Sequence, residues 1–260
     1  MRVSLNGIVS SDDDLEIYEW FNMKAFSPET IRNYIKDNPE GEELVLEINS
    51  PGGSVFAGGE MYTVLRDASQ NMYVRAEIQS LAASAASYLC LGCSEVLISP
   101  VGLMMVHMPT TATRGDKTAH QRSIGLLDSV REAILNAYKG KAGAASNRAE
   151  FRQMMSNETW LTAQQARDLG LVDGILYEET AIPENVMDLA AAGVRNQLVC
   201  QNCEGPMDIE TMRAEYRKAK AERKMIEGTV PLPKDWQAAA RLHLERDRFH
   251  YHNIEGGYSR

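Results

Sequence analysis

The turn Ser50-Pro51-Gly52-Gly53 constrains the fold more than any other segment of this sequence. The apolar run 44–48 precedes it and has the composition of a buried strand. Residues 55–68 follow it, with apolar side chains recurring at helical spacing. Glycine readily adopts the positive φ values that sharp turns require. The segment therefore predicts a βα unit, in which a strand ends at a tight glycine turn and a helix begins at once.

The same alternation continues along the chain. Further strands are predicted at residues 3–9, 72–78, 96–99, 104–107 and 171–176. Further helices are predicted at residues 28–35, 82–90, 117–138, 148–155 and 162–170. Strands alternating with helices indicate an α/β fold with a mostly parallel sheet.

The pattern weakens after residue 178, where Glu, Pro, Ala and Gly become frequent. We therefore predict a domain at 1–178, a linker at 179–206 and a charged, helical tail at 207–260. The tail holds 11 Lys and Arg against 9 Asp and Glu, which leaves 16 against 27 for residues 1–206. Such an acidic body repels phosphate backbones, so we expect no nucleic-acid partner.

Two observations bear on cellular location. The most apolar window, residues 81–93, contains two serines and is shorter than a membrane span. The first residues lack the basic stretch and apolar run of a signal peptide. We expect no membrane partner and a cytoplasmic location.

Three groups in order along the chain suggest acyl-transfer chemistry. Gly53 offers a backbone N–H beside a helix start, Ser84 follows a predicted strand, and His107 ends another. An oxyanion donor, a nucleophile and a general base are the parts such a site needs. The N–H of Ala85 would be a second donor, because the residue after a nucleophile often has that role.

Each signal also has a purely structural alternative. A Gly-Gly pair can serve a tight turn alone, and a lone histidine on an apolar strand is often a core residue. A buried serine bonded back to a helix carbonyl fits Ser87 better than Ser84.

The four cysteines form two Cys-x-x-Cys pairs, a spacing that zinc sites use. Cys90 and Cys93 lie where an apolar helix ends, as small hydrophobic residues do. Cys200 and Cys203 lie in the predicted linker, and the histidines that could join them are distant in the tail: His243, His250 and His252. We predict no metal site and no cofactor.

Four motifs together resemble the proteolytic subunit family of Clp proteases (ClpP). They are Ser50-Pro51-Gly52-Gly53, Ala82-Ala83-Ser84, Met105-Val106-His107-Met108-Pro109 and Gly170-Leu171-Val172-Asp173. The likeness covers about residues 2–177 in unbroken order. It implies a crotonase-like fold of stacked ββα units, followed here by a mainly helical or disordered tail. It also implies a serine endopeptidase with Ser84 as nucleophile, His107 as base, and Gly53 and Ala85 at the oxyanion positions.

The sequence departs from the family pattern at the acid of the triad. The family usually has an aspartate there, whereas the matching residue here is Glu158. A glutamate can hold the imidazole tautomer, and Asn157 is the alternative third member. Glu158 as a surface residue that caps the Thr162 turn is the structural alternative. Ser80 also replaces a usual glycine.

The chain starts almost at its first strand, so we expect no counterpart of the family's N-terminal pore segment. A shortened ClpP-like protease with an unrelated tail most resembles the phage head-maturation (prohead) proteases. This resemblance implies ATP-independent cleavage of scaffold and capsid subunits, in the host cytoplasm or prohead. It also implies a ring-shaped homo-oligomer without an ATPase partner.

Three alternatives remain open. The chain could be a catalytically inactive assembly protein, with helix 117–138 at the position of the family's ring-to-ring handle. It could also be a crotonase-type acyl-CoA enzyme on the same fold. A serine–lysine peptidase would need a catalytic lysine, and the nearest lysines after Ser84 are Lys117 and Lys139.

Overall fold

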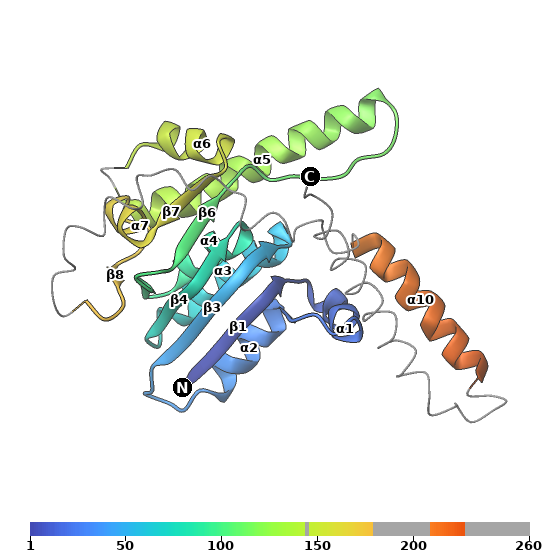
Figure 1. The fold of residues 1–260 in the computed structure, drawn as a ribbon, viewed down its shortest axis with the longest axis horizontal. Helices are drawn as coiled ribbons and strands as arrows, with labels where there is room; N and C mark the ends of the chain where they lie inside the picture. Colours follow the sequence, from blue (N-terminus) through green and yellow to red (C-terminus); the bar gives the residue numbers. More distant parts are fainter. Residues whose placement is uncertain (144–145, 179–208, 227–260) are drawn as a thin grey trace, which may run out of the picture. The chain divides into compact units, whose positions relative to one another are not determined.

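The computed structural model describes residues 1–143, 146–178 and 209–226 (Figure 1). Contacts within the chain group it into two units, Met1–Glu204 and Gly205–Arg260, and each is described by itself. In the second unit, the described residues form one helix, α10 (Ile209–Ile226), as the sequence predicts for the tail. The predicted linker 179–206, including Cys200 and Cys203, and the three tail histidines lie outside the described residues. The predicted domain boundaries stay predictions.

The first unit is built on an eight-stranded sheet. Its strands are β1 (Arg2–Val9), β2 (Ala25–Phe26), β3 (Leu44–Gly53), β4 (Val74–Ala83), β5 (Glu95–Ile98), β6 (Leu103–Val106), β7 (Thr159–Thr162) and β8 (Gly174–Ile175). The order β2-β1-β3-β4-β5-β8 is parallel throughout, while β6 pairs parallel with β4 and antiparallel with β7. This arrangement is the mostly parallel α/β sheet of the predicted fold class.

Helices connect these strands. They are α1 (Asp12–Trp20), α2 (Pro28–Asp37), α3 (Val55–Ala68), α4 (Ala85–Leu89), the 3₁₀ turn η1 (Cys90–Gly92), α5 (Lys117–Ala142), α6 (Arg148–Ser156) and α7 (Ala163–Asp168). Figure 1 shows α2 and α3 together on one face of the sheet. Local sequence sets several starts: Ser27 closes a capping box with Thr30, and Thr162 closes another with Gln165.

The core lies between β3, β4 and α3. The apolar side chains that these elements bury completely are Leu44, Leu46, Ile48, Met61, Leu65, Val74, Ala76, Ile78 and Ala82. Burying each large one contributes roughly 1.5–3 kcal/mol. The carboxyl ends of β3 and β4 are therefore fixed on a rigid base, and these ends carry the glycine turn and Ser84.

One predicted boundary is wrong. The sequence predicts a helix from residue 82, but β4 continues to Ala83 and α4 begins only at Ala85. Ala82 and Ala83 pair with Met104 and Met105 of β6. Alanine favours helix by itself, so here the tertiary pairing overrides local propensity.

Other differences concern short elements. The strand predicted at 171–176 is reduced to β8, and the sequence pattern does not predict α1, β2 or β7. Three aspartates, Asp12, Asp13 and Asp14, form the first turn of α1. The helix therefore lacks the continuous apolar stripe by which an amphipathic helix is predicted from sequence. β7 has four residues and exists by pairing with β6, a partner distant in sequence.

Candidate active site

Ser84 occupies the turn between β4 and α4. Its backbone has φ 52° and ψ −123°, a conformation that residues other than glycine adopt rarely and at a cost of about 1–3 kcal/mol. The turn is held by the core: the Ser84 N–H donates to Met105 O at 2.9 Å, and the Ser87 N–H donates to Ser84 O at 3.0 Å. In a sharp strand-to-helix turn of this kind, the serine hydroxyl projects away from the backbone and is accessible to a substrate.

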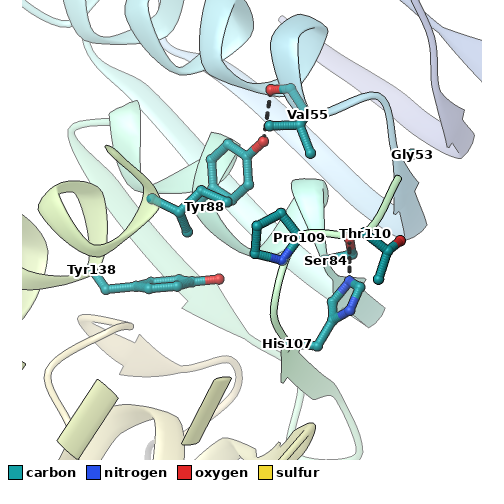
Figure 2. Close-up of a pocket in the computed structure, with 9 residues that line it drawn as sticks. Gly53, Val55, Ser84, Tyr88, His107, Pro109, Thr110 and Tyr138 are labelled. Atoms are coloured by element: carbon teal, nitrogen blue, oxygen red, sulfur yellow. Dashed lines mark hydrogen bonds between the residues drawn. The ribbon is translucent and has the colours of Figure 1, made fainter. Parts of the chain in front are cut away.

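His107 follows β6 directly and is half-buried. Its Nε2 lies 2.7 Å from the Ser84 Oγ, as Figure 2 shows. The register explains this meeting, because Ala83 at the end of β4 pairs with Met105 of β6. Ser84 and His107 therefore continue two neighbouring strands in the same direction, although 22 residues separate them in sequence.

Burial lowers the pKa of His107 below its ordinary value, and the negative charge of Glu158 opposes this shift. A lowered pKa keeps the imidazole neutral at neutral pH. A neutral imidazole has a free ring nitrogen that can accept the Ser84 proton.

The glycine turn lies directly against Ser84. Gly52 has φ +94°, and a Cβ there would lie 2.6 Å from both Ala83 O and Ser84 Cβ. Both the backbone conformation and the space exclude a side chain. The close approach of the turn to Ser84 thus explains why the predicted turn has glycine at this position.

Gly53 pairs with Val9 of β1, and the Ser54 N–H donates to Val9 O at 2.8 Å. In a parallel pair, a residue bonds to the two residues that flank its partner. Val9 therefore bonds to residues 52 and 54, and the Gly53 N–H points away from β1, toward the side of β4. Gly53 lines the same pocket as Ser84 and His107.

Ala85 is the first residue of α4 and is buried. Among the described residues, its N–H has no hydrogen-bond acceptor, as is common in the first turn of a helix. Its nitrogen is 2.9 Å from the position that a Cβ on Gly52 would take. Gly53 thus lines the same pocket as Ser84, and the Ala85 nitrogen lies next to the glycine turn.

Aliphatic, aromatic and hydroxyl-bearing side chains form the rest of the pocket wall (Figure 2). They belong to Val55, Tyr88, Pro109, Thr110, Ile134 and Tyr138. The Tyr88 hydroxyl donates to Val55 O at 2.8 Å. Sequence reasoning missed these as site residues. The available signal was Tyr138, a hydroxyl-bearing residue on the otherwise aliphatic stripe of helix 117–138.

Glu158 lies in the exposed turn between α6 and β7, with φ 47°. Within the part of the chain that the structure describes, it makes no hydrogen bond to His107 and acts on the imidazole through its charge. Asn157, the alternative, is the exposed C-cap of α6. Glu158 does not cap the Thr162 turn, because Gln165 fills that role.

Ion pairs hold α6, and with it the turn of Glu158, against α5. Glu132 of α5 accepts hydrogen bonds at 2.8 Å from both Arg148 and Arg152 of α6. The hydrogen bond from Arg148 is the main cause that lowers the pKa of Glu132 to about 2. The Met108 N–H, next to His107, donates to Met155 O in the last turn of α6 at 3.1 Å. These contacts set the distance between Glu158 and the imidazole.

Cys90 and Cys93 are buried free thiols. Burial raises the pKa of Cys90 to about 12 and that of Cys93 well above its ordinary value, so both stay protonated. Among residues 1–143, 146–178 and 209–226, no group of three or more His, Cys, Asp or Glu is arranged to hold a metal ion. A search of the same residues finds no helix with the length and apolar character of a membrane span.

Comparison with known proteins gives the same family as the motifs. The family model for Clp protease matches residues 33–179. The ATP-dependent Clp protease proteolytic subunit 1 of Chlamydia abortus is 30% identical over 151 residues, which cover 55% of this chain and 75% of that protein. The ATP-dependent Clp protease proteolytic subunit of Bacteroides fragilis is 24% identical over 148 residues, or 56% of this chain and 70% of that protein. This chain therefore belongs to the Clp protease family and is a serine-type peptidase.

Proposed function

We propose that this chain is an endopeptidase in which Ser84 is the nucleophile and His107 the general base. In this proposal, Gly53 and Ala85 donate to the oxyanion, and Glu158 supports the charged imidazole. The observation that carries the proposal is the 2.7 Å contact between Ser84 Oγ and His107 Nε2, in a pocket that both residues line together with Gly53.

The proposed reaction has two halves. His107 Nε2 takes the Ser84 proton while Oγ attacks the peptide carbonyl carbon and its π electrons move to the oxygen. The tetrahedral intermediate collapses, the C–N bond breaks, and the imidazolium gives its proton to the leaving amine. A water molecule, deprotonated by His107, then adds to the acyl carbon. The second tetrahedral intermediate collapses, the C–Oγ bond breaks, and the imidazolium returns the proton to Ser84 Oγ.

The amides of Gly53 and Ala85 would stabilise the developing negative charge on the carbonyl oxygen. Such donors act without reorganising, because the sheet and the start of α4 hold them in place. Each is expected to contribute roughly 10²–10³ in turnover. The exclusion of a side chain at Gly52 keeps the space between them open.

Glu158 would stabilise the imidazolium that forms when His107 takes the proton. Its charge already raises the pKa of His107 against the effect of burial. A direct hydrogen bond to Nδ1 requires the exposed turn to move toward the imidazole. Catalytic contacts often tighten only when substrate binds.

The test is Ser84→Ala beside wild type, with a fluorophosphonate probe that labels active-site serines and a peptide substrate. Wild type should be labelled and should cleave, and Ser84→Ala should do neither while keeping its thermal unfolding midpoint. Ser156→Ala, which removes an exposed serine of α6, is the matched control and should behave as wild type. Proteolysis retained in Ser84→Ala contradicts the assignment. An unlabelled, inactive wild type favours the inactive assembly protein instead.

We further propose that the chain assembles into a ring and cleaves scaffold and capsid subunits during phage head maturation, without ATP. The likeness to prohead proteases, a ClpP-like domain followed by an unrelated tail, is what supports the substrate class. The curated relatives, named as ATP-dependent, speak against the nucleotide independence. Exposed apolar side chains of α5, Ile124 (60% exposed) and Leu126 (48%), support assembly through that helix.

Mass spectrometry after co-expression with capsid and scaffold proteins tests the substrate class. Wild type should produce defined fragments that Ser84→Ala does not produce. The purified protein, incubated with a denatured substrate and no nucleotide, tests the energy requirement. Cleavage only when an ATPase and ATP are added would contradict the second proposal and leave the peptidase assignment intact.

A further inference from the structure

A chain of buried hydroxyl groups ends at the backbone of Ser84. The Ser87 Oγ lies 2.6 Å from Ser84 O and 2.6 Å from the Tyr138 hydroxyl. Ser87 and Tyr138 are both buried. A serine hydroxyl has one hydrogen, so Ser87 donates to Ser84 O and Tyr138 donates to Ser87.

This arrangement puts two donors on one carbonyl. Ser84 O accepts the Ser87 N–H at 3.0 Å as well as the Ser87 hydroxyl. In a trans peptide, the C=O and the following N–H point in opposite directions within one rigid plane. Whatever fixes the direction of Ser84 O therefore also fixes the direction of the Ala85 N–H, which has no acceptor among the described residues.

The peptide needs this support because Ser84 has an unfavourable backbone conformation. Its ψ of −123° sets the orientation of the plane that joins it to Ala85. Rotation of that plane would relieve strain at Ser84 and would turn the Ala85 N–H away from the glycine turn. The hydroxyl chain opposes this rotation from the side opposite the N–H.

We infer that Ser87 and Tyr138 are positioning residues that hold the Ser84–Ala85 peptide so that the Ala85 N–H points at the oxyanion. The inference rests on the proposed function and adds a role for α5, the helix that carries Tyr138. The Tyr138 ring is itself fixed by stacking on Phe151 of α6, with ring centroids 5.8 Å apart. The long helix is thereby connected to the nucleophile turn through two hydrogen bonds.

The experiment uses Ser87→Ala and Tyr138→Phe in the full chain. Two quantities are measured: the kcat and KM of a peptide substrate, and the inhibition constant of a peptidyl boronic acid, whose tetrahedral adduct with Ser84 places an oxygen at the oxyanion position. For Ser87→Ala, we expect kcat to fall about ten- to hundredfold, less than for loss of a whole donor. KM should change less than about twofold, and boronate inhibition should weaken in parallel with kcat, since both need the oxyanion donor.

Tyr138→Phe keeps the ring and its stacking and removes only the hydroxyl. It should lower kcat by about three- to tenfold, because Ser87 keeps its own bond to Ser84 O. In the Ser87→Ala background, Tyr138→Phe should have no further effect on kcat, since its partner is already absent. Additive effects of the two changes would overturn the idea that the hydroxyl groups act in series.

Ser69→Ala is the matched control. Its hydroxyl also donates to a backbone carbonyl, Gly92 O at 3.2 Å, but neither Ser69 nor Gly92 lines the pocket. It should lower the unfolding midpoint and leave kcat and boronate inhibition unchanged. If Ser87→Ala behaves as Ser69→Ala does, the positioning role is wrong while the peptidase assignment stands. If wild type is neither labelled by fluorophosphonate nor active, the proposed function itself fails.

Discussion

Ser84 and Glu158 share a positive φ, which is rare for residues other than glycine, and differ in their surroundings. Both are residues other than glycine with positive φ, at 52° and 47°. Ser84 lies between two paired strands and a buried helix, and its carbonyl accepts two hydrogen bonds. Glu158 lies in an exposed turn at the end of a surface helix. The core surrounds Ser84 itself, whereas Glu158 is held through its neighbours, the end of α6 and the start of β7.

The difference teaches that the core holds the two halves of the site to different degrees. Backbone pairing and apolar burial fix the serine, the imidazole and the two amides directly. The exposed turn of the carboxylate is held through its neighbours: α6 is anchored by buried Phe151 and Met155 and by the ion pairs of Glu132 with its arginines. Surface ion pairs are weak and easily rearranged, so the carboxylate is the part of the site that a substrate or an assembly partner can move.

The largest effect should come from the buried half. His107→Gln removes the base and keeps a side chain of similar polarity. We expect turnover to fall by about 10⁴, since a general base and an activated nucleophile are lost together. Hydrolysis of a peptide substrate measures the loss, and circular dichroism checks the fold. A loss below about tenfold would mean that the contact between Ser84 and His107 is not used.

Gly52→Ala tests the close approach of the glycine turn to the serine. The new Cβ would collide with the backbone at Ala83 and with Ser84, so we expect a loss of about 10² in kcat and destabilisation by at least about 1–3 kcal/mol. Gly59→Ala is the control: the helix position has no neighbour within 4 Å, so it should gain about 0.5–1 kcal/mol. Denaturant unfolding measures the stability of the two variants, and hydrolysis of a peptide substrate measures their kcat. Equal behaviour of the two variants would contradict the packing argument.

Glu158→Gln tests the exposed half. We expect kcat to fall by about tenfold, less than the usual contribution of a general acid or base, because the carboxylate does not contact the imidazole directly. Removing the negative charge also removes the influence that raises the pKa of His107. The acid limb of kcat/KM should therefore move to lower pH. An acid limb that moves to higher pH would contradict the electrostatic role, and Glu158→Asp, which keeps the charge, should leave the limb nearly in place.

The wild-type pH profile follows from the same pKa shift. The base must be neutral, and burial lowers the pKa of His107 below 6.5. Activity should therefore be constant above pH ~6.5 and should fall only as the pH drops through the lowered pKa. Measurement of kcat/KM against pH shows the limb directly. An acid limb above pH 7 would mean that the charge of Glu158, and not burial, has the larger influence on the pKa of His107.

The smallest effect should come from Asn157→Ala, the alternative third member. Asn157 is exposed as the C-cap of α6, so we expect less than about a twofold change in kcat. Glu158→Gln and Asn157→Ala measured side by side decide between the two residues. A larger loss in Asn157→Ala would assign the role to the amide.

Most of the fold could be predicted from the sequence because local signals decide most of it. The bounds of α3 match the prediction, since Ser54 caps its start and an apolar stripe follows. The parallel arrangement follows from alternating strands and helices. The end of β4 could not be predicted, because Ala82 and Ala83 are strand residues only through pairing with β6.

The sequence by itself determined which candidate catalytic groups follow one another along the chain: a glycine turn, a serine and a histidine, each at the end of a strand. Only the tertiary structure decided their distances, because parallel register places strand ends together that are far apart along the chain. It also decided that Tyr138 meets Ser87 and that Glu158 stays at the surface. A local pattern states which face of an element is apolar, but not which hydroxyl or carboxylate another element will bring to it.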